Sequence, residues 1–290
     1  MRDFEYMRPT TVDEATGFLA ANAADSLIIG GGTAAVVMLH LGILRPQYVV
    51  DLGGIDALRG VSVNGGTHLG ALASVRSLER SADVQRACGL LSHAASQVAN
   101  VRVRNVATVG GAVSYGEPQT DVPVALTALG ASVTIAGSSG ERKVALDAFY
   151  RGPYETVLEP GELVTGIDIP SLAPNTGGCH EKFSIGSPEN KPVANASALV
   201  TVDPSTGHCL AVRVVMGAVG PTPVVSAAAA SLVGESLTED LIAEVAAEAA
   251  EETDPIEDLR GPVWYKRRIT RVLVERALRC AQQKASGQPT

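Results

Sequence analysis

The amino-acid sequence predicts an α+β protein. Three patterns indicate this class: one β-α-β unit close to the N-terminus, two hairpin signals in the middle of the chain, and alternating strands followed by two long helices towards the C-terminus. A chain of 290 residues is long enough to bury a core divided among two or three substructures. We expect units at residues 1–57, 58–175 and 176–290, because the linker-like stretch "PSLAPNTGG" marks the second boundary.

The first unit is predicted to contain a helix and a small parallel sheet. Thr11 and Glu14 in "TVDEATGFLAAN" have the spacing of a capping box, which indicates the start of a helix. "SLIIGGG" then has the pattern of a buried strand that runs into a turn, "TAAVVMLHLGIL" that of a helix, and "PQYVVDL" that of a second strand. Strand, helix and strand in this order predict parallel pairing.

The second unit is predicted to be mainly antiparallel. Asn64-Gly65-Gly66 and the stretch from Gly137 to Gly140 each separate two short strand patterns, which is a hairpin signal. A helix, "CGLLSHAASQVAN", lies between the hairpins. It is followed by "NVATVGGAV", in which a second pair of glycines comes after an apolar run that resembles a strand.

The third unit is predicted to be a small antiparallel sheet covered by helices. "ALVTVD" and "CLAVRVVMGAV" alternate as strands do and enclose the turn "PSTGH". Two helical patterns follow, "TEDLIAEVAAEAAEE" and "PVWYKRRITRVLVERALRCAQQK".

Composition excludes several classes of function. The formal net charge of -8 argues against nucleic-acid binding, which needs a basic surface. No apolar stretch reaches the ~18 residues of a membrane span, and the N-terminus lacks a signal peptide, so we expect a cytoplasmic protein. Histidines are scattered, and we expect no catalytic residue and no metal site in this chain. The four cysteines lie far apart, so we expect buried reduced thiols and no iron–sulfur cluster: Cys88, Cys179, Cys209 and Cys280.

The glycine triplet admits two interpretations. Gly30-x-Gly32-x-x-Ala35 fits a dinucleotide fingerprint, and Asp51 ends the next strand, where a ribose-binding acid is expected. That would make the chain an NAD(P)-dependent dehydrogenase, although the β-α-β alternation stops after one unit. Alternatively, the triplet and the glycine pair of "ATVGGAV" close on one diphosphate from two sides, with backbone N–H groups as donors.

The order of several stretches supports the second interpretation. "FEYMRPTTVDEA", "IIGGGTAAVVM", "RPQYVVDL", "VRNVATVGGAV", "HEKF" and "DLRGPVWYKRR" together resemble the FAD-binding medium subunit of the molybdenum hydroxylases, the medium chain of the xanthine dehydrogenase and carbon monoxide dehydrogenase type. The resemblance covers nearly the whole chain. It implies a bipartite FAD-binding fold of the vanillyl-alcohol oxidase (PCMH) type, followed by a C-terminal α+β domain.

The resemblance also implies which residues hold FAD. The two glycine loops contact the diphosphate, and Lys182 lies beside the flavin ring and stabilises its reduced form. Asp121 accepts hydrogen bonds from sugar hydroxyls or caps the following helix. Glu162 and Leu163 lie along the isoalloxazine through backbone contact and packing. The full expected set is Ile29, Gly30, Gly31, Gly32, Thr33, Ala34, Thr108, Val109, Gly110, Gly111, Ser114, Asp121, Glu162, Leu163 and Lys182.

The function implied by the resemblance is electron transfer. A large molybdopterin-binding subunit hydroxylates a small substrate, a small subunit relays the electrons through 2Fe–2S clusters, and FAD in this chain passes them to an external acceptor. A dimer of heterotrimers is the expected assembly. The substrate, the acceptor and the segment that covers the flavin face stay open. Two alternatives also stay open: a stand-alone NAD(P)-dependent dehydrogenase, and a flavin-free assembly module.

Overall fold

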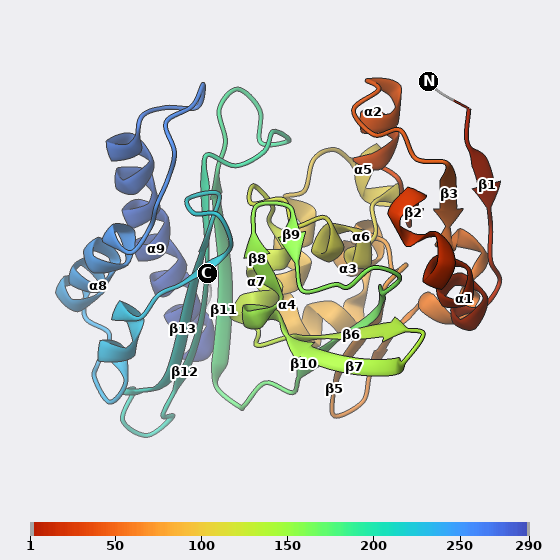
Figure 1. Cartoon of the computed structure of the whole chain (residues 1–290). Helices are drawn as coiled ribbons and strands as arrows, with labels where there is room; N and C mark the ends of the chain where they lie inside the picture. The colour runs from red at the N-terminus through yellow and green to blue at the C-terminus, as the bar shows by residue number, and fades with distance from the viewer. Residues whose placement is uncertain (1–2, 289–290) are drawn as a thin grey trace.

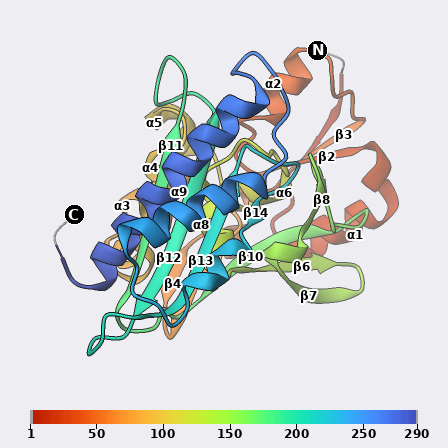
Figure 2. The same cartoon turned by 90° about the vertical axis from the view of Figure 1, so that its left-hand side faces the viewer.

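The computed structural model describes residues 3–288 and arranges them in chain order from one side of the molecule to the other (Figure 1). The strands form a three-stranded sheet (β1-β3-β2), a five-stranded sheet (β4-β5-β10-β6-β7), a four-stranded sheet (β11-β12-β13-β14) and the pair β8-β9. Helices of the middle part lie between the five-stranded and four-stranded sheets, and the last two helices cover the outer face of the latter (Figure 2). The predicted α+β class is therefore confirmed.

The first part of the chain has the predicted helix and parallel sheet. Thr11 caps the helix by accepting the Glu14 N–H, and the Glu14 carboxylate accepts the Thr10 N–H at 2.7 Å. All pairings in this sheet are parallel. Its first strand, which the sequence pattern did not indicate, has only three residues and depends on pairing with a strand far along the chain. The elements are β1 (Glu5–Met7), α1 (Val12–Asn22), β2 (Ser26–Ile29), α2 (Ala35–His40) and β3 (Tyr48–Asp51).

The middle part contains both predicted hairpins, β4–β5 and β6–β7, and β10 joins them into one antiparallel sheet. Helices of this part pack on the sheet around a large apolar core. The strands are β4 (Val61–Val63), β5 (Gly66–Gly70), β6 (Ser132–Gly137), β7 (Gly140–Ala145), β8 (Tyr150–Gly152), β9 (Glu155–Thr156) and β10 (Leu163–Pro170). The helices are α3 (Val75–Arg80), α4 (Ala82–Ser96), α5 (Val101–Val106), α6 (Val109–Ser114) and α7 (Val122–Ala128).

The second glycine pair does not follow a strand, so that part of the prediction is wrong. Asn100 caps α5 through the N–H groups of Arg102 and Val103, and Thr108 caps α6 through the Gly111 N–H. Two side-chain caps so close together make the β-branched run helical. Both glycines therefore lie in the first turn of α6.

The last part is the predicted antiparallel sheet with helices on its outer face. Gly177 shows how closely α9 approaches the sheet, because a Cβ there would lie 2.1 Å from the Ala281 carbonyl oxygen. The elements are β11 (Thr176–Phe183), β12 (Ala194–Val202), β13 (Cys209–Gly217), β14 (Val224–Val225), α8 (Glu239–Glu251) and α9 (Val263–Ala285). Short 3-10 helices complete the chain: η1 (Ala23–Asp25), η2 (Leu52–Gly54), η3 (Asp56–Leu58), η4 (Leu146–Ala148) and η5 (Ala228–Leu232).

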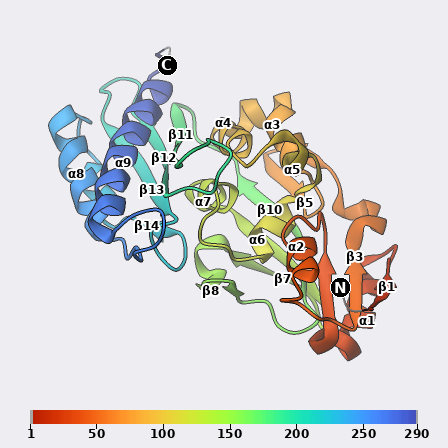
Figure 3. The same ribbon diagram turned by 90° about the horizontal axis from the view of Figure 1, so that it is seen from above.

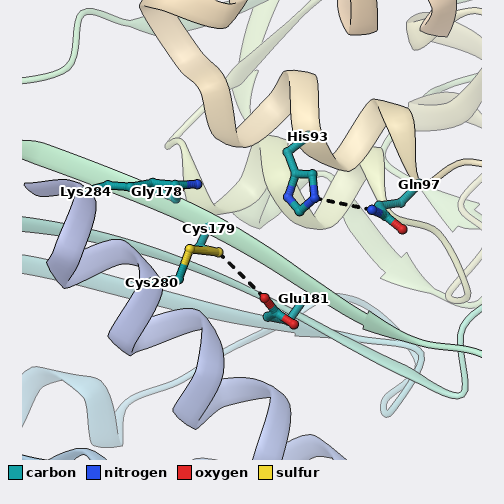
Figure 4. Close-up of a disulfide and its surroundings, with 7 residues drawn as sticks. All are labelled: His93, Gln97, Gly178, Cys179, Glu181, Cys280 and Lys284. Carbon is teal, nitrogen blue, oxygen red and sulfur yellow. Dashed lines mark hydrogen bonds between the residues drawn. A yellow bond between two sulfur atoms is a disulfide. The ribbon is translucent and has the colours of Figure 1, made fainter. Parts of the chain in front are cut away.

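A disulfide joins β11 to α9 (Figure 4). Cys179 and Cys280 are 101 residues apart in sequence, and their Cα atoms are 5.9 Å apart in the structure. The expectation that these two are reduced thiols is therefore wrong, because the packing of α9 on the sheet brings them together. Cys88 and Cys209 are free and buried, as expected, and burial raises the pKa of both thiols.

The predicted unit boundaries remain predictions. One core cluster contains Leu19 and Val50 from the first predicted unit together with Leu72 and Leu163 from the second, so these two share apolar packing. Of the helices within residues 3–288, none is long and apolar enough to span a membrane.

Candidate nucleotide-binding site

The two glycine stretches meet. A Cβ on Gly31 would lie 2.0 Å from the Val106 carbonyl oxygen and 3.0 Å from the Ala107 Cα. A Cβ on Gly30 would lie 2.8 Å from the Thr108 hydroxyl. The turn after β2 therefore packs main chain to main chain against the segment between α5 and α6. Seen from above, this part of the chain lies on the opposite side of the molecule from α8 and α9 (Figure 3). The protein's own backbone is thus one reason why no side chain is tolerated here.

The first turn offers unoccupied hydrogen-bond donors. Within residues 3–288, the N–H groups of Gly31, Gly32, Thr33 and Ala34 donate to no protein acceptor. Gly32 has a φ of +69°, a left-handed conformation that glycine adopts without strain. Consecutive free N–H groups beside a left-handed residue and before a helix are a typical anion-binding arrangement. Ile29, the residue that ends β2, leads the chain into this turn.

The second glycine pair is different, because its donors are already used. Val109 donates to the Ala73 carbonyl at 2.9 Å, and Gly110 to the Ala71 carbonyl at 2.9 Å. Gly111 donates to its own cap, Thr108, at 3.2 Å. The expectation that both loops present free N–H groups is therefore correct only for the first loop. The second loop supports the first, and it exposes Gly111 and partly exposes Ser114 on α6.

Asp121 lies in a buried polar network and not at an open groove. Its carboxylate, 4% exposed, accepts from Lys182 Nζ at 2.9 Å and from Asn195 Nδ2 at 2.8 Å, and it contacts His180 Nε2 at 3.3 Å. Burial raises the pKa of Asp121, but the hydrogen bond and charge of His180 and the charge of Lys182 outweigh it and hold the pKa below its usual value. Asp121 occupies the N-cap position of α7, yet its side chain makes no cap bond. The capping interpretation of that side chain is therefore wrong, and the sugar-binding role remains a prediction.

Lys182 is not a solvated surface lysine. Its side chain is 5% exposed, and Nζ also donates to the Gln97 carbonyl at 2.7 Å. It lines a hollow of about 200 Å³ together with Gln97, Phe183, Ser184 and the following loop. A larger open cleft of about 710 Å³ lies between the β4–β5 hairpin and the C-terminal end of α9, and none of the expected cofactor residues lines it.

Leu163 is linked to the first glycine turn through shared apolar packing, whereas Glu162 pairs with Arg142. The Leu163 side chain is 2% exposed and shares a core cluster with Leu72, a residue that also contacts Gly30. The Glu162 carboxylate accepts from Arg142 Nε at 2.8 Å and from Arg142 Nη2 at 2.6 Å, and the Arg142 hydrogen bond lowers the pKa of that carboxyl. Both side chains are thus engaged within the protein, and the Glu162 N–H also donates to the Glu159 carbonyl at 3.0 Å.

Asp51 does not offer a free ribose-binding carboxylate. It accepts hydrogen bonds from the Tyr6 hydroxyl and, at 2.8 Å, from the Gly53 N–H, and it lies 3.8 Å from the Arg8 guanidinium. The sheet that contains it has three strands and one β-α-β unit. Both features argue against a stand-alone NAD(P)-dependent dehydrogenase with a dinucleotide-binding fold.

Three partners in the Asp121 network are absent from the residues expected from sequence: Gln97, His180 and Asn195. One signal was present for His180, because it stands two positions before Lys182 on β11 and alternate strand residues share a face. Gln97 acts through its carbonyl, which any residue has, so no sequence signal marks it. Among residues 3–288, no group of three or more His, Cys, Asp or Glu side chains is placed to hold a metal ion.

Comparison with known proteins decides between the interpretations. A family model described as the FAD binding domain in molybdopterin dehydrogenase matches residues 2–172, and one described as the CO dehydrogenase flavoprotein C-terminal domain matches residues 189–281. The chain belongs to the FAD-binding medium subunits of the molybdenum hydroxylases. This medium subunit is therefore an oxidoreductase subunit with an FAD-binding domain, and the family resemblance and the expected FAD-binding fold are confirmed.

Similar medium subunits serve different enzymes. The chain is 32% identical over 280 residues to the carbon monoxide dehydrogenase medium chain of Hydrogenophaga pseudoflava, with 96% of each chain covered. It is 29% identical over 279 residues to the glyceraldehyde dehydrogenase medium chain of Sulfolobus acidocaldarius, covering 96% of this chain and 98% of that one. A solved structure of the Hydrogenophaga pseudoflava carbon monoxide dehydrogenase superposes with a TM-score of 0.93 at 31% identity, covering 97% of each chain.

Proposed function

We propose that this medium subunit binds the FAD diphosphate on the N–H groups of Gly31, Gly32, Thr33 and Ala34, collects electrons from 2Fe–2S clusters of a small subunit and passes them to an external acceptor. The observation that carries the proposal is the row of unused N–H groups in a turn held by the second loop. FAD, when bound, accepts electrons singly and releases them singly or in pairs.

The residues present fit a diphosphate. Four N–H donors precede α2, and they supply positive electrostatic potential without a lysine. Gly31 lets the supporting loop approach to main-chain contact, so the donors are held in position before the ligand arrives. Gly111 and Ser114 would lie beside the bound ligand on α6, and Val109 and Gly110 are buried behind them.

The proposed partners are a large molybdopterin-binding subunit and a small 2Fe–2S subunit, assembled as a dimer of heterotrimers. Support comes from the relatives' names, which describe medium chains of a carbon monoxide dehydrogenase and a glyceraldehyde dehydrogenase. These two relatives have nearly the same sequence identity to this chain, yet their names give different substrates. We therefore assign the choice of substrate to the large subunit. Co-purification of three chains is expected, and substrate hydroxylation by this chain alone would contradict the proposal.

Removal of one N–H donor tests the diphosphate site. Ala34→Pro replaces the N–H with a ring carbon and so deletes the donor. The Ala34 backbone has φ -91° and ψ -46°, about 25° from the φ of proline. A hydrogen bond to a charged group contributes about 1.5–3 kcal/mol, so FAD affinity should fall about 10- to 150-fold. Ala34→Ser keeps the N–H and is the matched control. Equal FAD affinity of the two variants would refute the site.

The cofactor itself separates the remaining alternatives. A yellow full-length chain that releases FAD on denaturation is the expected result. A colourless chain that binds NADH would support the stand-alone dehydrogenase, and a colourless chain that binds no nucleotide would support the assembly module.

A further inference from the structure

The network around Asp121 joins the middle of the chain to the C-terminal sheet. Asp121 precedes α7, whereas His180 and Lys182 come from β11 and Asn195 from β12. One carboxylate oxygen accepts from Asn195 at 2.8 Å and contacts His180 at 3.3 Å, and the other accepts from Lys182 at 2.9 Å. All four side chains are almost completely buried. One oxygen of the Asp121 carboxylate is therefore held by His180 and Asn195, and the other oxygen holds Lys182.

Lys182 retains one unused donor. An ammonium group has three N–H bonds, and within residues 3–288 Nζ donates to Asp121 Oδ2 and to the Gln97 carbonyl, at 2.9 and 2.7 Å. The side chain is 5% exposed and lines the hollow of about 200 Å³. The third N–H is thus available to an electron-rich group that enters this hollow.

We infer that Asp121 is a positioning residue: it fixes the Lys182 ammonium at the hollow, His180 and Asn195 fix the carboxylate, and the ammonium contacts the electron-rich edge of the flavin ring. The inference rests on the proposed function. It assigns to Asp121 a role that acts through Lys182.

Two physical arguments support this assignment. A lysine side chain is flexible, and two acceptors at hydrogen-bond distance restrict its ammonium to one location. A buried cation also acts on an added electron more strongly than an exposed one, because the local dielectric is lower. Asp121 compensates the charge of Lys182 in the resting protein, so that the ammonium is not an isolated buried ion.

The test is a double-mutant cycle on the FAD-loaded full chain. Its readout is the ratio of reduced to oxidised flavin at a fixed solution potential, followed by flavin absorbance with a redox dye. Lys182→Gln should lower the ratio about tenfold, equivalent to about 30 mV for a two-electron couple. Asp121→Asn should also lower it, by about threefold or more, because an amide has one acceptor oxygen and cannot hold both sides of the network. In the Lys182→Gln background, Asp121→Asn should have no effect.

The sign of the Asp121→Asn effect is decisive. If Asp121 acted only by its charge, its removal would favour the reduced flavin and raise the ratio. In the otherwise wild-type chain, a rise or no change in the ratio on Asp121→Asn would overturn the inference. In the Lys182→Gln background, a fall as large as in the wild-type chain would also overturn it.

Asn195→Ser gives the same information if Asp121→Asn does not fold. It loosens the carboxylate without a change in charge, so positioning predicts a lower ratio and a purely electrostatic role predicts no change. Lys143→Gln is the matched control, because it removes a lysine from an ion pair with Asp168 in which the lysine is 63% exposed, and it should leave the ratio unchanged. A wild-type chain without FAD would refute the proposed function, whereas FAD-loaded variants without coupling would refute only the positioning role.

Discussion

Replacement of Gly31 by alanine should destabilise the protein and release FAD together. The added Cβ would lie 2.0 Å from the Val106 carbonyl oxygen, and this oxygen belongs to backbone that has no rotamer to change. An ordinary carbon–oxygen contact is about 3.3 Å, so the two loops must separate by about 1.3 Å. Overpacking costs about 1–3 kcal/mol, occasionally more, and we expect about 3 kcal/mol here because both sides of the contact are main chain.

Thermal unfolding measures this effect. About 3 kcal/mol corresponds to a fall in Tm of about 6–12 °C for a chain of this size class, and the separation of the loops should also lower the FAD content. Gly17→Ala is the matched control: nothing lies within 4 Å of its added Cβ, and it sits inside α1. That substitution should stabilise the helix by about 0.5–1 kcal/mol. A Gly31→Ala chain with unchanged Tm and full FAD would refute the packing argument.

Further predictions concern the disulfide and acid stability. Without reductant, the unfolded chain should expose two reactive thiols, from Cys88 and Cys209, and four reactive thiols would contradict the bridge. Cys280→Ser should lower the free energy of unfolding by about 4 kcal/mol, since the bridge closes a sequence separation of 101 residues. The pKa of Asp121 is lowered on folding. Its contribution to the free energy of unfolding is therefore present above the unfolded-state pKa of about 3.9 and is lost as pH falls through the folded-state pKa. Urea midpoints should therefore fall below about pH 4, and less so in Asp121→Asn; identical acid dependence of the two chains would contradict this.

Local signals in the sequence determined much of the architecture. The Thr11 cap, the hairpin at Asn64-Gly65-Gly66 and the alternation of β12 and β13 were readable because each depends on neighbours within a few residues. The same holds for the first glycine turn, whose free N–H groups follow from a glycine run that enters a short helix. The order of the motifs along nearly the whole chain then indicated the family.

Long-range contacts decided the rest. Three-residue β1 exists only through its pairing with β3, and the disulfide only through the packing of α9 on β11. Glycine spacing alone could not separate Gly31, which makes room for the opposing backbone, from Gly32, which supplies a left-handed turn. The Asp121 and Lys182 pair is 61 residues apart in sequence, and neither residue type by itself indicates burial. Such contacts depend on which surfaces meet after folding, and a pattern that extends over a few residues carries no information about them.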